Sequence, residues 1–261
     1  MDINLNNKNI VVMGVANNFS IAWHIAKSLN NANANVIFTY VNEKFRNNID
    51  KLSNSLSENS LIVECDVTSD ESIRNCFKTI SEKVGVIHGI VHSIAFANKD
   101  ELKGEYLNTT REGFLIAQNV SAYSLTGVIK EAEQYMTEGG SIVTLTYYGS
   151  EKVVPNYNVM GVAKASLDMS VKYLANDLGR KNIRINAISA GPIKTLSAKG
   201  VSDFNLILDE IEKQSPLRRL TDPSEVGDTA LFLISDLSRG ITGEIIHVDS
   251  GFNILGGRNT I

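Results

Sequence analysis

The sequence predicts an α/β fold in which helices cover both faces of a doubly wound parallel sheet of about seven strands. Short runs of β-branched and aliphatic residues alternate with longer amphipathic stretches along the whole chain. The short runs are apolar throughout, as expected of strands that are buried on both faces. Only 4 of the 261 residues are prolines, and no low-complexity tract or internal repeat divides them. We therefore expect a single domain over residues 1–261, built around one sheet.

The predicted elements begin as strand, helix and strand, over residues 9–13, 21–30 and 36–40. The remaining predicted strands cover 61–65, 89–93, 141–146, 183–189 and 244–248. The remaining predicted helices cover 71–84, 109–136, the segment that begins at Tyr157, 202–214 and 223–234. Because open parallel sheets bind ligands outside the carboxyl ends of their strands, the residues that follow each apolar run are the candidates for chemistry.

Composition narrows the possible partners and compartment. The formal net charge is −4 and hydrophobic residues make up 43% of the chain, close to globular averages. The sequence contains neither a Lys/Arg-rich run that would attract a polyanion nor an apolar run approaching the ~20 residues that span a bilayer. The N-terminus lacks signal-peptide features, and Cys65 and Cys76 lack metal-ligand spacing. We expect a cytoplasmic protein with reduced thiols, no metal site, and no nucleic-acid or membrane partner.

Tyr157 and Lys164 form the most informative pair in the chain. They are seven residues apart, and at about 100° per residue this spacing returns both side chains to one helix face. The same stripe continues in steps of three and four through Met160, Leu167, Val171, Leu174 and Leu178. Lys164 thus stands where an aliphatic residue is expected, so it must snorkel, find a partner or serve a ligand. Chance pairing of two common residue types is the alternative, and the segments at the strand ends weigh against it.

Polar and glycine residues follow the first three predicted strands. Gly14 opens a turn that ends at Ser20, where a helix N-terminus would offer N–H groups to a pyrophosphate; an ordinary turn with Ser20 as N-cap fits as well. After the second strand, Val41 and Asn42 supply neither the acid that binds a ribose 2′-hydroxyl nor the base that binds a 2′-phosphate. After the third strand, Asp66 either accepts a hydrogen bond from an adenine amino group or caps the next helix.

Two later segments complete the predicted ligand edge. The fourth strand ends in HSIAFA (92–97), which is small and apolar where a ring can pack, and we expect its histidine to be structural. The sixth strand ends in a small-residue loop that is kinked at Gly191-Pro192 and can cover a cofactor. An amphipathic helix follows with Leu206, Leu208 and Ile211 on one face, so we predict a substrate-covering loop and helix over about 195–214.

Four motifs occur together and in order: Gly14-x5-Ser20-Ile21-Ala22, HSIAFA (92–97), Tyr147-x9-Tyr157-x6-Lys164 and NAISAGPIKTLSAKG (186–200). They closely resemble the enoyl-[acyl-carrier-protein] reductases of bacterial fatty-acid synthesis, in the divergent branch of the short-chain dehydrogenase/reductase superfamily. The resemblance continues to GEIIHVDSGF (243–252) and so covers essentially the whole chain. A ketoacyl reductase, the nearest alternative, has its lysine four residues after the tyrosine, whereas position 161 here is Gly.

The resemblance implies a Rossmann-like fold and transfer of a hydride from NADH to the β-carbon of a trans-2-enoyl thioester on acyl carrier protein. This is the last reductive step of fatty-acid elongation, and NADPH stays open as the alternative cofactor. The implied catalytic residues are Tyr147, Tyr157 and Lys164, and the implied substrate contacts are Ala97, Tyr147 and Tyr157. The implied cofactor contacts are Gly14, Ser20, Ile21, Asp66, Val67, Ile94, Lys164, Ile193, Lys194, Thr195, Leu196 and Ser197.

A second apolar edge on the Tyr157 helix predicts a further packing partner. It consists of Val159, Val162, Met169 and Tyr173, and a helix that is apolar on two faces needs two partners. Together with the resemblance, this edge predicts a symmetric homotetramer. The rival functional class is a nucleotide-sensing protein that has kept the fold without catalysis. Retention of Tyr157 and Lys164 argues against that class, because a sensor needs the cofactor pocket and not the phenol.

Overall fold

The centre of the molecule is a seven-stranded sheet in the order β3-β2-β1-β4-β5-β6-β7. The computed structural model describes residues 3–56, 60–193, 195 and 204–256, with the backbone alone for 204–207. The strands are β1 (Asn9–Met13), β2 (Asn35–Tyr40), β3 (Ile62–Glu64), β4 (Gly89–His92), β5 (Gly140–Thr146), β6 (Ile183–Ala190) and β7 (Ile245–Val248). Every neighbouring pair is parallel. The predicted fold class is therefore confirmed.

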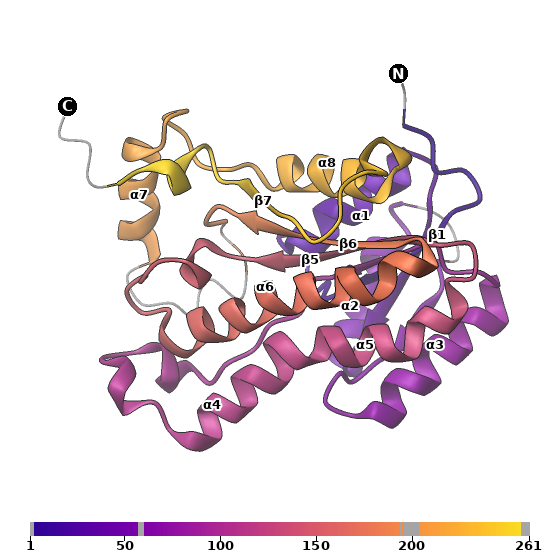
Figure 1. The fold of residues 1–261 in the computed structure, drawn as a ribbon, viewed down its shortest axis with the longest axis horizontal. Helices are drawn as coiled ribbons and strands as arrows, with labels where there is room; N and C mark the ends of the chain where they lie inside the picture. The colour runs from indigo at the N-terminus through magenta and orange to yellow at the C-terminus, as the bar shows by residue number, and fades with distance from the viewer. Residues whose placement is uncertain (1–2, 57–59, 194, 196–203, 257–261) are drawn as a thin grey trace.

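Helices cover both faces of this sheet. They are α1 (Ile21–Asn31), α2 (Glu43–Ser53), α3 (Asp70–Val84), α4 (Arg111–Gln118), α5 (Ser124–Ala132), α6 (Asn158–Leu178), α7 (Phe204–Gln214) and α8 (Pro223–Ile234). Figure 1 shows α1 and α8 on one face and α3, α5 and α6 on the other, with α7 at one end of the sheet.

Each strand divides its side chains between two hydrophobic cores. In β1, Val11 and Met13 join the core under α3, α5 and α6, whereas Ile10 and Val12 join the core under α1 and α8. Side chains alternate between the faces of a strand, and all four of these residues are almost completely buried. An apolar run with no polar alternation is thus the signature of a strand at the centre of three layers.

Two helical segments differ from the sequence-based expectation. Helix α2 was not predicted, because only Ile49 and Ser53 of its eleven residues are buried and its apolar periodicity is correspondingly sparse. The predicted helix over 109–136 is interrupted by a π-helical stretch, Asn119–Tyr123. There the Ser121 hydroxyl donates to the carbonyl oxygen of Phe96 (3.0 Å) and accepts from the Phe96 N–H (2.9 Å). A wide turn of this kind re-aims side chains toward a neighbouring loop.

Helix α6 shows one buried stripe and a smaller second edge than expected. Lys164, Leu167 and Val171 are buried on the sheet side. Val159 is also buried, against Leu102 and other residues of the same chain, and is therefore not free to meet a partner. The second edge is reduced to Val162, which is partly buried, and to Met169 and Tyr173, which are 51% and 71% exposed.

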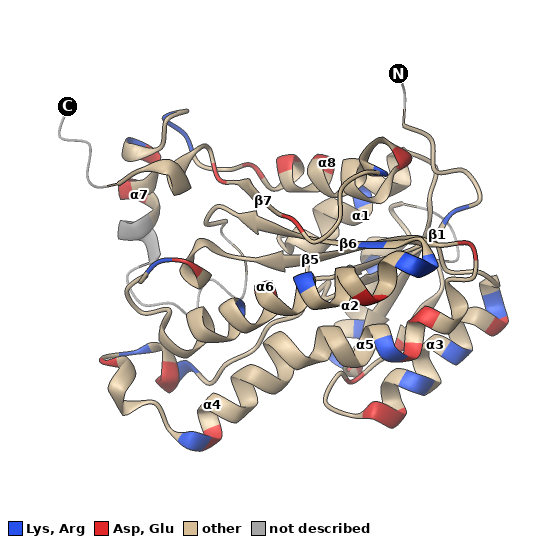
Figure 2. Ribbon diagram, viewed as in Figure 1, with Lys and Arg blue, Asp and Glu red and all other residues tan. Residues whose placement is uncertain are grey.

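The surface gives no indication of a membrane span or of a one-sign charge field on the helices in view. Within residues 3–56, 60–193, 195 and 204–256, no helix is both long and apolar enough to cross a bilayer. Figure 2 shows basic and acidic residues interspersed along the ribbon of α3 and its neighbours. Mixed signs of this kind are typical of an ordinary solvated face.

The contact between α1 and α8 generates a stability prediction. Helix α8 approaches α1 at Gly227, where an added Cβ atom would lie 2.6 Å from Ser28 Oγ and 2.9 Å from the carbonyl oxygen of His24. We expect Gly227→Ala to lower the free energy of unfolding by about 1 to 3 kcal/mol, because overpacking outweighs the gain in helix propensity. Gly179→Ala is the matched control, since nothing lies within 4 Å of its Cβ position. Urea unfolding measures both; equal midpoints for the two variants would contradict the prediction.

Candidate active site

The parallel sheet brings most of the predicted site residues to one edge. Gly14 follows β1, Asp66 and Val67 follow β3, Ile94 follows β4, and Tyr147 follows β5. Ile193 and Thr195 come after β6 on the same edge, and both are at least partly buried. Lys194, Leu196 and Ser197, which the sequence also assigned to the cofactor, lie outside the described residues. The edge thus gathers segments that are far apart along the chain, as the topology requires.

Gly14 allows the β1 turn to touch the segment after β4. Its φ angle is +94°, and a Cβ atom built on it would lie 1.9 Å from the carbonyl oxygen of Ser93. Only a residue without a side chain satisfies both constraints. The close approach leaves the backbone of the turn open to a ligand, which is how glycine serves in nucleotide-binding turns.

Ser20 organises this turn in a way that differs from the predicted N-cap role. Its hydroxyl oxygen accepts hydrogen bonds from the N–H groups of Ala16 (3.0 Å) and Asn17 (3.1 Å). Ser20 occupies the N-cap position of α1, but its side chain makes no cap hydrogen bond to the helix. The first-turn N–H groups of α1 therefore carry no side-chain cap, and a helix N-terminus of this kind binds phosphate. The residues present fit the pyrophosphate of a dinucleotide.

One of the two roles predicted for Asp66 is wrong, because Asp66 does not cap the helix that follows it. Its Oδ1 atom accepts from the N–H (2.9 Å) and hydroxyl (2.7 Å) of Thr68. The cap of α3 is Ser69, whose Oγ accepts from the Ser72 N–H. The Asp66 carboxylate thus shapes the loop after β3 and stays half-buried at the ligand edge.

Lys164 is buried and hydrogen-bonded to the backbone of β5. Its side chain is 5% exposed, and Nζ donates to the carbonyl oxygen of Leu145 at 2.7 Å. Burial lowers the pKa of Lys164 to about 8, and the nearby charge of Asp168 acts in the opposite direction. The ammonium is therefore poised close to its titration range, and it points from α6 toward the end of β5.

Tyr157 and Tyr147 pack edge to face beside Lys164. Their ring centroids are 4.9 Å apart with an interplanar angle of 70°. Burial raises the pKa of Tyr157 above its usual range, and burial together with Asp249 raises the pKa of Tyr147 to about 12. Both side chains are consequently phenols at neutral pH, and each can donate an O–H hydrogen bond.

Sequence reasoning missed the residues that shape the pocket of Tyr157. A Cβ atom on Gly149 would lie 2.5 Å from the Tyr157 ring, and one on Gly161 would lie 2.7 Å from the carbonyl oxygen of Gly149. Asn156 and Asn158 flank the tyrosine with φ angles of 60° and 34°. Positive φ at two non-glycine residues is uncommon and is typical of functional turns. The Asn-Tyr-Asn triplet was the available signal, because asparagine tolerates this region best.

His92 is structural, as the sequence suggested. It is fully buried, with Nδ1 3.0 Å from Thr144 Oγ1 and Nε2 2.9 Å from Ser124 Oγ. Burial, reinforced by the charge of Lys164, lowers its pKa to about 3. A ring that stays neutral and is hydrogen-bonded at both nitrogens ties β4 to β5 and α5.

Ala97 meets Tyr157 in a small apolar cluster. Ala97, Phe114 and Tyr157 pack against the buried residues Leu102, Ala117, Val159, Met160 and Ala163. Phe96 beside it is 52% exposed. This cluster gives the phenol an apolar neighbourhood that can receive a hydrocarbon chain.

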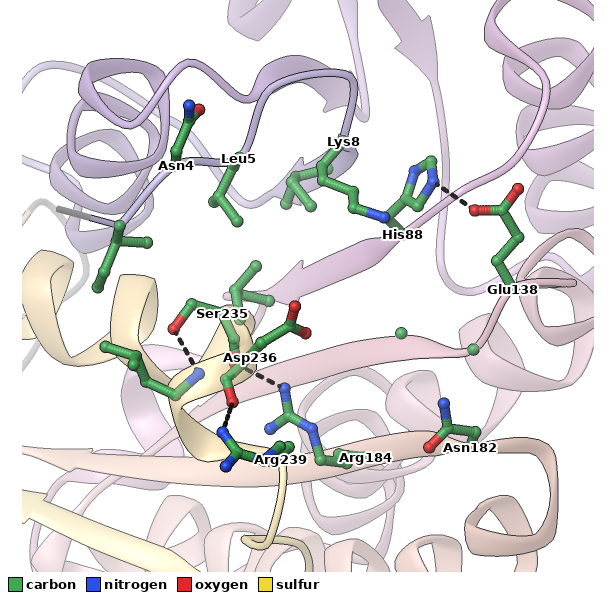
Figure 3. Close-up of a pocket in the computed structure, with 16 residues that line it drawn as sticks. Asn4, Leu5, Lys8, His88, Glu138, Asn182, Arg184, Ser235, Asp236 and Arg239 are labelled. Atoms are coloured by element: carbon green, nitrogen blue, oxygen red, sulfur yellow. Dashed lines mark hydrogen bonds and ion pairs between the residues drawn. The ribbon is translucent and has the colours of Figure 1, made fainter. Parts of the chain in front are cut away.

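A cavity of about 300 Å³ lies among loops at the opposite, amino edge of the sheet. Figure 3 shows Arg184 and Arg239 on one side of it and Lys8, His88 and Glu138 on the other. The Arg184 guanidinium already donates to the carbonyl oxygens of Leu233 and Ser235 and to Ser238 Oγ. These hydrogen bonds hold the chain after α8. The cavity is separate from the edge that carries Tyr157, because its lining residues lie at the amino ends of the strands.

A partly buried tyrosine and a buried lysine seven residues apart at the nucleotide edge of such a sheet characterise the short-chain dehydrogenase/reductase superfamily, and this chain is an oxidoreductase of that class. Residues 14–253 match the protein family described as Enoyl-(Acyl carrier protein) reductase, and the chain belongs to that family.

The sequences of individual relatives align with this chain over almost their full length. The chain is 66% identical to the Bacillus subtilis enoyl-[acyl-carrier-protein] reductase [NADH] FabI over 255 residues, 97% of this chain and 99% of that protein. It is 56% identical to the [NADPH] FabI of Staphylococcus aureus over 254 residues, again 97% and 99%. A Bacillus cereus enoyl-acyl carrier protein reductase, solved with NADP+ and an indole naphthyridinone, superposes with a TM-score of 0.96 at 64% identity and covers 98% of this chain and 100% of that one.

Proposed function

We propose that this chain reduces the carbon–carbon double bond of trans-2-enoyl thioesters on acyl carrier protein, using NADH, in the cytoplasm. The observation that carries the proposal is the arrangement of the partly buried Tyr157 and Tyr147 and the buried Lys164 at the carboxyl edge of the sheet. Family membership and the names of the relatives support the same activity. Residues 1–261 would act as one reductase domain.

Tyr157 would act on the substrate carbonyl. As a buried phenol with a raised pKa, it keeps its proton at neutral pH and can donate a hydrogen bond to the thioester oxygen. That bond strengthens as the oxygen gains negative charge, so Tyr157 stabilises the enolate-like transition state more than the ground state. Tyr147, packed against the Tyr157 ring, would line the acyl pocket, with Ala97 at its mouth.

The remaining site residues would hold the cofactor. When bound, NADH supplies the hydride that reaches the β-carbon. The turn closed by Ser20 would hold the pyrophosphate together with Gly14 and Ile21, and Lys164 would donate to the nicotinamide ribose hydroxyls. The proposed adenine contacts are Asp66 and Val67, the proposed nicotinamide contact is Ile94, and the proposed contacts with the carboxamide and phosphates are Ile193 and Thr195, with Lys194, Leu196 and Ser197 beside them.

The segment 195–214 would cover the substrate. Leu208 and Ile211 of α7 are buried, which supports an apolar inner face on this helix. The C-terminal end of α7 is anchored, because Arg218 Nη1 donates to the carbonyl oxygens of Lys213 (2.5 Å) and Gln214 (3.3 Å). The Pro216 end of the segment is therefore held in place, and Gly200 at the other end lies outside the described residues.

The catalytic assignment predicts the behaviour of a conservative variant. Tyr157→Phe should lower kcat for a crotonyl thioester by about 10²-fold or more while NADH still binds, because the lost hydrogen bond acts mainly in the transition state. Steady-state absorbance at the NADH band gives kcat, and cofactor fluorescence gives the dissociation constant. If the wild-type chain binds NADH but does not reduce the substrate, the protein is a nucleotide sensor and not a reductase. If Tyr157→Phe is fully active, the catalytic role assigned to the phenol is wrong.

Cofactor preference depends on the residues after β2. Asn42 caps α2 by accepting from the Phe45 N–H, and no acidic side chain stands at 41 or 42 to repel a 2′-phosphate. Arg46 is engaged, because its guanidinium lies 5.6 Å from the Tyr40 ring centroid and 3.5 Å from Glu43. Lys44 is exposed and is thus better placed than Arg46 to reach a phosphate. We propose NADH as the preferred cofactor, with modest discrimination against NADPH.

The ratio of kcat/KM for NADH over NADPH, measured with one enoyl substrate, tests this preference. We expect a ratio above one, since a 2′-phosphate finds no preformed cationic partner next to β2. Lys44→Ala should raise the ratio further, because the loss of this ammonium weakens NADPH binding more than NADH binding. Arg46→Ala is the comparison variant and should change the ratio less. A wild-type ratio below one would overturn the choice of NADH.

We propose a symmetric homotetramer, for which exposed apolar side chains on adjoining helices are the support. Met169 and Tyr173 on α6 are 51% and 71% exposed, and Leu115 and Tyr123 nearby are 59% and 49% exposed. Helix α6 packs against α4 and the π-helical stretch that carry these two residues. Apolar side chains gathered in this way mark a protein interface, and a two-fold axis would let the patch pair with itself.

Light scattering at micromolar concentration tests the assembly. The wild-type chain should have four times the mass of one chain. Tyr173→Glu should reduce the mass, because a carboxylate would be buried without a partner. Lys172→Glu, an exposed neighbour on the same helix, serves as the control for charge alone and should leave the mass unchanged. A monomeric wild-type mass would rule out the tetramer.

A further inference from the structure

Asp168 lies one helical turn beyond Lys164 on α6, and the proposed mechanism does not use it. The two side chains are 7% and 5% exposed. A spacing of four residues places them on neighbouring positions of one helix face. Carboxylates are almost never buried to this extent unless they are paired, so Asp168 needs a physical reason for its place.

The polar groups that act on Asp168 are the hydroxyls of Ser150 and Thr146 and the charge of Lys164. The Asp168 Oδ1 atom and Thr146 Oγ1, both buried, have no hydrogen-bond partner within the described part of the chain. Lys164 Nζ donates to the carbonyl oxygen of Leu145, which uses one of the three hydrogens of an ammonium. An unpartnered carboxylate oxygen therefore stands one turn from an ammonium with hydrogens to spare.

The other titratable groups around Lys164 and Asp168 do not supply this charge. Tyr157 at the start of α6 and Tyr147 after β5 stay protonated, and His92 on β4 stays neutral. Glu151 is exposed and lies 3.0 Å from His247 of β7. The carboxylate of Asp249 is taken up by the N–H groups of Gly251 and Asn253 and by the amide of Asn253.

We propose that Asp168 is a positioning residue for Lys164, whose carboxylate keeps the lysine in its ammonium form and so available to the ribose hydroxyls of the cofactor. The Asp168 Oδ1 atom has no hydrogen-bond partner among the described residues, so the attraction to Lys164 acts through the weakly screened interior. The inference rests on the function proposed above, because it concerns the residue that would hold the nicotinamide ribose.

The sign of the effect follows from the two opposing influences on Lys164. Burial lowers its pKa to about 8, and Asp168 raises it. Burial also raises the pKa of Asp168, an effect that the hydroxyls of Ser150 and Thr146 and the charge of Lys164 oppose. Without the Asp168 carboxylate, nothing among these groups opposes the effect of burial on the pKa of Lys164. Lys164 would then lose its proton at a lower pH. Cofactor binding should then weaken at a lower pH than in the wild type.

The test measures the dissociation constant of NADH by fluorescence from about pH 6.5 to 9.5, a range that brackets the titration of a buried lysine. We expect wild-type binding to weaken as the pH rises through about 8. Asp168→Asn should move this midpoint down by about 1 pH unit, the usual effect of one nearby charge. Asp168→Ser is a second uncharged variant, so the comparison survives if one of the two does not fold.

Two further variants separate charge from structure. Asp168→Glu keeps the carboxylate and should return the midpoint toward the wild-type value. Asp177→Asn makes the same substitution at an exposed position of the same helix and should leave the midpoint unchanged. A thermal midpoint that falls in Asp168→Asn and Asp168→Ser while their binding midpoints match the wild type would overturn the inference and leave the enoyl reductase assignment intact. Failure of the wild type to bind NADH at any pH would instead defeat the proposed function itself.

Discussion

The hydrogen bond from Lys164 Nζ to the carbonyl oxygen of Leu145 is the interaction on which the active edge depends. It joins the middle of α6 to the end of β5 at 2.7 Å, and a buried ammonium without such an acceptor would be costly. Together with the buried Leu167 and Val171 on the same face, the bond holds α6 against the sheet and so positions Tyr157, two turns earlier. The edge-to-face contact with Tyr147 then follows from the position of β5.

The nucleotide side of the edge is organised by neutral contacts. Gly14 and Ser93 bring the ends of β1 and β4 together, and His92 ties β4 to β5 and α5 through two hydroxyls. These groups do not change charge near neutral pH, since the pKa of His92 is held at about 3. The contacts that join these strand ends thus keep a constant charge near neutral pH, whereas Lys164 on α6 has a pKa of about 8.

The sequence predicted the sheet well and the fine structure of the site less well, for physical reasons. The strands could be read because the central ones, β1, β4, β5 and β6, are buried on both faces and therefore mostly apolar. The Tyr157 and Lys164 pair was visible because helical spacing is local. The π-helical stretch was not visible, because it is stabilised by Ser121 contacts with Phe96, 25 residues away. Asp168 resembled an ordinary surface acid, since burial of a charge leaves no mark on composition.

Gly161 stands at the position where the ketoacyl-reductase pattern has its lysine, four residues after the tyrosine. In this chain a Cβ atom there would meet the carbonyl oxygen of Gly149 at 2.7 Å, so the backbone around Tyr157 forbids any side chain at that position. The two tyrosine–lysine spacings are therefore not separated by one substitution. A side chain at position 161 requires the loop that carries Gly149 to move, so a change between the two spacings alters the backbone around the active site as well as the lysine.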